Sequence, residues 1–220
     1  MMALDPSDYI DTFIVKQGYY EREVFDALAS QLQPPSDVVW DVGANLGIHS
    51  LTLAKLNPGL TVVCFEPNPY LVEILRWQSD ANRLKGVSII PAALSDKEED
   101  SLLHLYPGNA GMSSLIDWSG RAACSIPVQL IRADILIDSG RIPMPNLIKL
   151  DVEGSELTVL QGLGPGIESP DLRAIVFEDG RDSDSPVKML LRQSGFAISE
   201  PLLRQESTSH NLENYIATRE

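Results

Sequence analysis

Acidic side chains stand at or near the ends of four apolar segments of this sequence. They are Asp41 in VVWDV (38–42), Glu66 in TVVCFE (61–66), Asp151 in NLIKLD (146–151), and Glu178 with Asp179 in LRAIVFED (172–179). Ligands of open α/β sheets bind beyond the carboxyl ends of the strands, so we expect these carboxylates to line one site. There they can pair with an ammonium group, accept hydrogen bonds from hydroxyls, or take up a proton.

The turn DVGANLG (41–47) follows the first of these segments and precedes an apolar helical pattern. A dinucleotide site would show GxGxxG here without an acid in front, because a pyrophosphate must lie against the turn. Asp41 would repel phosphate and attract an ammonium group. Glu66 lies 23 residues after Gly43, where a carboxylate can accept both hydroxyls of a ribose. S-adenosylmethionine has an ammonium, a sulfonium and a ribose but no phosphate, so it fits both features.

The segments that position these residues alternate between strand and helix. Besides the four strands above, the pattern predicts helices over 19–32, 46–56 and 155–163, a helix that Asn68 caps and Gly86 closes, and a strand over 87–94. Strands separated by single helices indicate a doubly wound, mostly parallel sheet covered on both faces. Residues 100–137 interrupt the alternation and predict a β-hairpin insertion, and FAISEPLL with NYIAT predicts a terminal antiparallel pair.

Length and charge set limits on partners and location. The 220 residues fit a single compact domain, in which we divide an N-terminal helical cap (1–36) from a ligand-binding domain (37–220). The net charge of −14 disfavours binding to nucleic acid or to an anionic membrane. The start lacks the pattern of a secretory signal, and Cys64 and Cys124 form no CxxC motif, so we expect a cytoplasmic protein without a disulfide framework.

Four segments in order resemble the FkbM-type methyltransferase family, class I enzymes that use S-adenosylmethionine. They are DVGANLGIHS (41–50), FEPNP (65–69), AALSD (92–96) and IKLDVEGSELTVLQGL (148–163), with GNAGMSSL (108–115) and FED (177–179) in addition. The resemblance implies a class I (Rossmann-like) α/β fold with a seven-stranded sheet. It also implies methyl transfer to an oxygen of a small-molecule or glycan acceptor, and no Asn/Asp-Pro-Pro-Tyr/Phe motif of amino-directed enzymes is present.

The resemblance also assigns the cofactor site residue by residue. Asp41 would face the ammonium directly or through water, Glu66 would hold the ribose, and Asn68 would touch the ribose or the adenine edge. The remaining positions are Gly43, Ala44 and Asn45 beside the methionine portion, and Ala93 and Leu94 beside the adenine.

Three residues are candidates for the reacting end. Asp151 and Glu153 would face it, although a purely structural role in capping the next helix remains an alternative. His49, with a side chain that titrates near neutral pH, is a candidate base or a packed side chain.

The carboxylates of Asp151, Glu178 and Asp179 could converge on Mg²⁺, as in catechol-type O-methyltransferases. Those enzymes place a lysine three residues after the aspartate, where this sequence has Gly154, and we favour metal-independent transfer. Two rival functions stay open, an NAD-dependent oxidoreductase and a catalytically silent cofactor-binding module.

Overall fold

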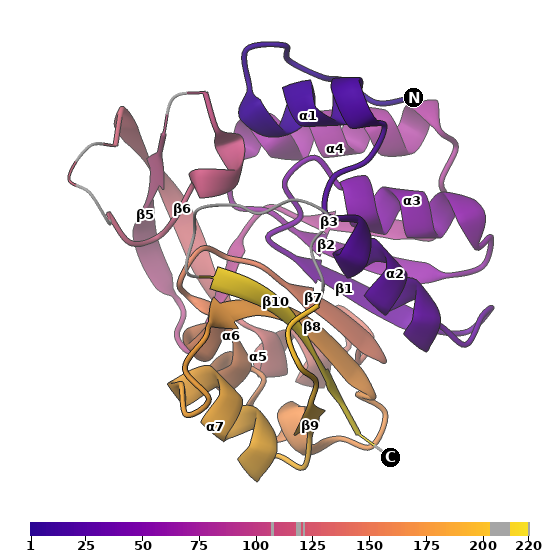
Figure 1. Ribbon diagram of the computed structural model, residues 1–220, viewed down its shortest axis with the longest axis vertical. Coiled ribbons are helices and arrows are strands. Elements are labelled where there is room, and N and C mark those ends of the chain that lie inside the picture. Colours follow the sequence, from indigo (N-terminus) through magenta and orange to yellow (C-terminus); the bar gives the residue numbers. More distant parts are fainter. Residues whose placement is uncertain (107, 118–119, 121, 203–211, 220) are drawn as a thin grey trace.

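The computed structural model describes residues 1–106, 108–117, 120, 122–202 and 212–219. Its centre is a seven-stranded sheet in the order β3-β2-β1-β7-β8-β10-β9 (Figure 1). The strands are β1 (Val38–Val42), β2 (Thr61–Phe65), β3 (Val87–Ile90), β7 (Leu147–Leu150), β8 (Ala174–Gly180), β9 (Ala197–Ile198) and β10 (Leu212–Thr218). The neighbours among β3, β2, β1, β7 and β8 pair in parallel, and β10 pairs antiparallel with both β8 and β9. The predicted doubly wound, mostly parallel sheet with a terminal antiparallel pair is confirmed.

The strand register brings the predicted site to one edge of this sheet. Val42 lies beside Phe65 on one side and Leu150 on the other, and Leu150 lies beside Phe177. The residues that follow these four positions therefore emerge next to one another. The strand order also reverses between β1 and β7, which is where open α/β sheets bind their ligands.

Helices cover both faces of the sheet because alternate strand residues point to opposite sides. On β1, Val39 packs with α2 (Arg22–Gln31), α3 (Ile48–Leu56) and α4 (Pro69–Ala81). Trp40 and Val42 pack with α5 (Ala133–Asp138), α6 (Glu156–Gly162) and α7 (Pro186–Gln193) on the other face. The 3-10 helix η2 (Gly164–Glu168) follows α6. Burial of each large apolar side chain in these two clusters stabilises the fold by about 1.5–3 kcal/mol.

One predicted strand is wrong in its extent. Residues 87–94 do not form a single strand, because the chain leaves the main sheet after Ile90 and Pro91 has no N–H for the ladder. β4 (Ala93–Ser95) belongs to a second sheet of three strands, parallel to β6 (Cys124–Arg132), which pairs antiparallel with β5 (Glu99–Leu105). The predicted hairpin insertion is thus β5 and β6, and the segment between them contains the 3-10 helix η1 (Ala110–Met112).

The N-terminal region holds two helices where the sequence predicted one. The helix expected over 19–32 is α2, and α1 (Tyr9–Gln17) precedes it. The Asp8 side chain accepts the N–H groups of Ile10 and Asp11, and Gly18 ends α1 in the left-handed region at φ +81°. The Tyr9 N–H donates to the Gly108 carbonyl at 2.9 Å, which joins α1 to the insertion. The boundary at residue 36 stays a prediction.

Across the described ranges, no helix combines the length and the apolar character needed to cross a membrane.

Candidate functional site

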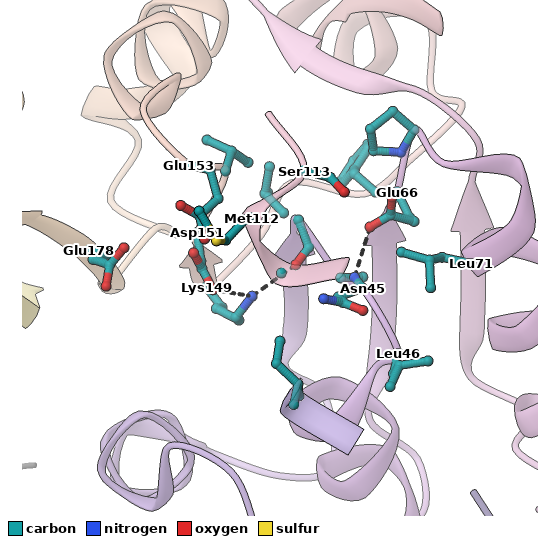
Figure 2. Close-up of a pocket in the computed structure, with 18 of the residues that line it drawn as sticks. Asn45, Leu46, Glu66, Leu71, Met112, Ser113, Lys149, Asp151, Glu153 and Glu178 are labelled. Carbon is teal, nitrogen blue, oxygen red and sulfur yellow. Dashed lines mark hydrogen bonds and ion pairs between the residues drawn. The ribbon is translucent and has the colours of Figure 1, made fainter. Parts of the chain in front are cut away.

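A cavity of about 570 Å³ opens at the carboxyl edge of the parallel strands. The residues around it come from the ends of β1, β2, β7 and β8, from β4, and from the N-terminal region and the insertion (Figure 2). Nine of the eleven residues predicted for the site line this cavity: Gly43, Ala44, Asn45, His49, Glu66, Ala93, Leu94, Asp151 and Glu153. Asp41 and Asn68 do not line it, and their positions are explained below.

The glycine turn after β1 is fixed by backbone contacts. The N–H groups of Gly43 and Ala44 both donate to the Phe65 carbonyl, at 3.1 and 3.0 Å. Gly43 has φ +78°, and a Cβ built there would lie 1.8 Å from the Asp151 carbonyl oxygen. The close approach of the Asp151 backbone, just after β7, therefore requires glycine at position 43. Asn45 follows in the left-handed region, and no described residue donates to its buried Oδ1.

The Glu66 carboxylate lies just beyond the end of β2, and the residue is 5% exposed. Its Oε2 accepts the Asn45 N–H and its Oε1 accepts the Asn68 N–H, each at 2.8 Å. Burial raises the pKa of Glu66 to about 7, although the two backbone hydrogen bonds lower it. A carboxylate has about four acceptor positions, so Glu66 retains capacity for two further donors.

Asn68 serves the helix rather than the cavity wall. Its Oδ1 accepts the Tyr70 N–H at 3.0 Å and so caps α4, whose first residue is Pro69. The predicted N-cap is confirmed. The Asn68 side-chain oxygen is engaged in this cap, and the Asn68 backbone N–H donates to the Glu66 carboxylate.

Lys149 occupies the space behind the glycine turn. Its Nζ donates to the Gly43 carbonyl at 2.9 Å and lies 3.2 Å from Asp41 Oδ1 and 3.4 Å from Asp151 Oδ2. Asp41 is 1% exposed, so its carboxylate faces Lys149 and not the cavity. Burial lowers the pKa of Lys149, but the carboxylates of Asp41 and Asp151 outweigh it and raise the pKa overall. The lysine is therefore charged.

Three carboxylates converge across the cavity from Glu66. One oxygen each of Asp151, Glu153 and Glu178 lies within 4.8 Å of the others, an arrangement that could hold a metal ion (Figure 2). Asp179, the third acid of the predicted Mg²⁺ set, hydrogen-bonds to Ser185 instead. Burial and the neighbouring Asp151 raise the pKa of Glu153 to about 8.

The turn that carries Glu153 is held from two sides. Glu153 has φ +54°, and Glu156 Oε1 accepts the N–H groups of Val152 and Gly154 at 3.1 and 3.2 Å. Ser114 Oγ from the insertion donates to the Glu153 carbonyl at 2.7 Å. Glu156 thus holds the turn before α6, Glu153 makes no capping hydrogen bond to any described residue of this helix, and Glu153 lines the cavity.

His49 lies in the first turn of α3 and is 4% exposed. Its Nε2 is 3.8 Å from Glu21 Oε2, the carboxylate of the residue that precedes α2. The side chain borders the cavity, but it is packed beside an acid of the N-terminal region.

None of the side chains in the wall opposite the strand ends was among the predicted site residues. This wall consists of apolar and aromatic side chains from α1, the segment before α2 and the insertion, among them Ile10, Ile14, Tyr20, Met112 and Leu115. The spacing of Ile10 and Ile14 between Asp8 and Gly18 is the signal that could have predicted α1. Lys149 lies in the recognised motif, but nothing in its spacing indicated a contact with Asp41.

The strand order, the glycine turn at the switch point and the carboxylate after β2 define the class I methyltransferase fold. A solved structure of magnesium protoporphyrin IX methyltransferase (ChlM) from Synechocystis PCC 6803, with bound S-adenosylmethionine, has this fold. It aligns with a TM-score of 0.56 and 11% identity over 97% of this chain and 85% of that one. The Methyltransferase FkbM domain matches residues 41–198, and the chain belongs to the FkbM methyltransferase family. It is an enzyme that uses S-adenosylmethionine as its methyl donor.

Two curated relatives are named for different acceptors. Hexuronic acid methyltransferase AglP of Haloferax volcanii is 33% identical over 77% of this chain and 67% of its own length. The 31-O-demethyl-FK506 methyltransferase FkbM of Streptomyces tacrolimicus is 29% identical over 74% of both chains. The relatives of this chain therefore include one named for a hexuronic acid and one named for 31-O-demethyl-FK506.

Proposed function

We propose that this protein transfers the methyl group of S-adenosylmethionine to a hydroxyl oxygen of a small molecule or a glycan. The observation that carries the proposal is the placement of Asp151 and Glu153 in the same cavity as Glu66. One carboxylate can hold the ribose of the donor while the others meet an acceptor hydroxyl. The names of both relatives agree with such an acceptor.

The residues on the donor side fit S-adenosylmethionine. Glu66 has acceptor capacity for the two ribose hydroxyls after its two backbone hydrogen bonds. The Asn45 Oδ1, which no described residue satisfies, is available to the ammonium of the methionine portion. Ala93 and Leu94 offer apolar surface to the adenine. Asp41 and Asn68 do not contact the donor in this proposal. Asp41 pairs with Lys149, and the Asn68 N–H orients the Glu66 carboxylate.

The acceptor side needs little more than positioning. The sulfonium of S-adenosylmethionine supplies an already activated methyl group, so orientation of the two substrates accounts for much of the rate. Glu153, with its pKa raised to about 8, is suited to accept the hydroxyl proton near neutral pH. Asp151, paired with Lys149, orients the hydroxyl as a hydrogen-bond acceptor; burial raises the pKa of Asp151, although Lys149 lowers it. The base role of His49 is the weaker alternative because its Nε2 faces Glu21.

The wall formed by α1 and the insertion faces the acceptor in this proposal. We propose that residues 1–36 form a cap whose Ile10, Ile14 and Tyr20 contact an apolar part of the acceptor. The absence of nucleic-acid and membrane partners and a cytoplasmic location stay predictions from composition and charge.

A product analysis tests the proposal. The protein is incubated with S-adenosylmethionine carrying a ¹³C-methyl group and a panel of sugars, uronic acids and polyhydroxylated natural products. We expect S-adenosylhomocysteine to accumulate with an acceptor and NMR to place the label on oxygen. A label on nitrogen or carbon would contradict the proposal. Binding of the donor without turnover across a broad panel would favour the silent module, and tight binding of NAD in its place would favour the oxidoreductase.

A further inference from the structure

Lys149 joins three separate parts of the site through one ammonium group. Its Nζ contacts the Gly43 carbonyl in the donor turn, the Asp41 carboxylate within β1, and the Asp151 carboxylate beyond β7, at 2.9, 3.2 and 3.4 Å. The contact with Gly43 is a hydrogen bond, whereas the contacts with Asp41 and Asp151 are ion pairs, and no described group donates a hydrogen bond to the Asp41 carboxylate. Figure 2 shows Lys149 beneath Asp151, on the side of the cavity that faces the glycine turn.

Stabilisation of the fold does not explain why Lys149 and Asp41 are buried as a charged pair. The Lys149 and Asp41 side chains are 6% and 2% exposed, and such charges lose hydration energy when they are buried. Replacement of a buried ion pair by apolar side chains is often neutral or stabilising, so stability alone does not call for these charges. The ammonium attracts both the Gly43 carbonyl and the Asp151 carboxylate and so holds the donor turn and Asp151 together, which an uncharged apolar side chain cannot do.

Lys149 is also the one lysine or arginine among the described residues that line the cavity. The groups that act electrostatically on Asp151 from the surrounding elements are otherwise acidic or imidazole side chains, namely Glu21 before α2, His49 on α3, Glu153 after β7, Glu156 on α6 and Glu178 on β8. The Tyr20 hydroxyl lies near the same acids. Without Lys149, the Asp151 carboxylate would therefore turn away from its acidic neighbours.

We propose that Lys149 is a positioning residue that holds the cofactor turn at Gly43 and the acceptor-side carboxylate of Asp151 in a fixed relative geometry. The inference rests on the proposed function for the role of Asp151. It predicts that one substitution weakens donor binding and methyl transfer together, although Lys149 need not touch either substrate.

The test uses two variants that leave neither member of the buried Lys149–Asp41 pair as an unpaired charge. Asp41→Asn with Lys149→Met removes both charges of the buried pair and all three contacts. Lys149→Arg keeps the charge, but its planar guanidinium cannot direct three N–H groups as a lysine ammonium does. The matched control is Lys188→Met, because Lys188 is 2% exposed and its Nζ likewise combines hydrogen bonds to carbonyls, those of Gly180 and Asp182, with an ion pair, to Asp179 at 3.7 Å, all outside the cavity.

Each variant is examined by thermal unfolding, by calorimetric titration with S-adenosylmethionine, and by kcat at saturating donor. For the double variant we expect the Kd of the donor to rise about tenfold and kcat to fall about tenfold or more, since hydrogen bonds from charged groups carry effects of this size. Lys149→Arg should show the same directions to a smaller extent. Lys188→Met should lower the unfolding temperature and leave both Kd and kcat unchanged.

Two results would overturn the inference. The first is a folded double variant, or Lys149→Arg, with the wild-type Kd and kcat. The second is a loss in Lys188→Met as large as in the Lys149 variants, which would assign the effect to stability. Failure of the proposed function is distinguishable, because the wild-type protein would then not bind S-adenosylmethionine or would not form S-adenosylhomocysteine.

Discussion

Because the pKa of Glu66 is raised, we expect stability and donor affinity to change in opposite directions as the pH rises. The folded protein raises this pKa from 4.5 to about 7, chiefly by burial, so the neutral carboxyl is favoured in the folded state. Its contribution to stability is fully present below pH 4.5 and is lost as the pH rises through about 7. At 1.36 kcal/mol per pKa unit, the loss amounts to at most about 3 kcal/mol.

Glu66→Gln removes this dependence because the amide does not titrate. We expect the difference in unfolding free energy between the variant and the wild-type protein, without ligand, to shift in favour of the variant by up to about 3 kcal/mol between pH 5 and pH 8. Glu153 also titrates in this range, but it is present in both proteins and cancels in the difference. The assay is urea unfolding at several pH values.

Donor binding should change in the other direction. If the ionised Glu66 accepts the ribose hydroxyls, the wild-type Kd for S-adenosylmethionine should weaken about tenfold from pH 8 to pH 6, and Glu66→Gln should weaken binding at pH 8 by about tenfold or more. Titration of the donor's own ammonium affects both proteins equally. Glu73→Gln on the exposed face of α4, where Glu73 pairs with Arg76, is the control and should change nothing. Equal pH profiles of Kd for wild type and Glu66→Gln would refute the reasoning.

Three further predictions follow from the geometry. Gly43→Ala should abolish donor binding and lower the yield of folded protein, because its Cβ would lie 1.8 Å from the Asp151 carbonyl oxygen. A stable variant with the wild-type Kd would contradict this prediction and show that the Asp151 backbone can move away from the turn. Glu153→Gln should lower kcat about 100-fold or more with little change in the donor Kd, as expected for loss of a general base, and an unchanged kcat would remove Glu153 from that role. Turnover should survive EDTA; loss on chelation that Mg²⁺ restores in the wild type but not in Asp151→Ala would establish a metal site at Asp151, Glu153 and Glu178.

The central sheet and several of the residues that line the cavity were predictable because their signals are local. Apolar runs that end in acids predicted the strands, and the glycine turn with Glu66 predicted residues that line the cavity where β1, β2 and β7 end. Asn68 and Pro69 predicted the start of α4 from capping chemistry alone.

The remainder depends on contacts between distant parts of the sequence. Lys149 meets Asp41 and Gly43 only because β7 pairs with β1, and a lysine in an apolar run gives no sign of its partners. The wall of the cavity requires α1 to dock on the insertion through Tyr9 and Gly108, a contact across 99 residues of sequence. The break after Ile90 was missed because VSIIPAAL is apolar apart from Ser88, and Pro91 only weakly marks the change of sheet.

A crystal structure with S-adenosylhomocysteine bound tests the central claim most directly. We predict that both ribose hydroxyls donate to the Glu66 carboxylate, that the methionine portion lies along Gly43, Ala44 and Asn45, and that the sulfur faces Asp151 and Glu153 across open space for an acceptor. A ligand bound elsewhere, or one whose ribose does not contact Glu66 and whose sulfur points away from these two acids, would contradict the account.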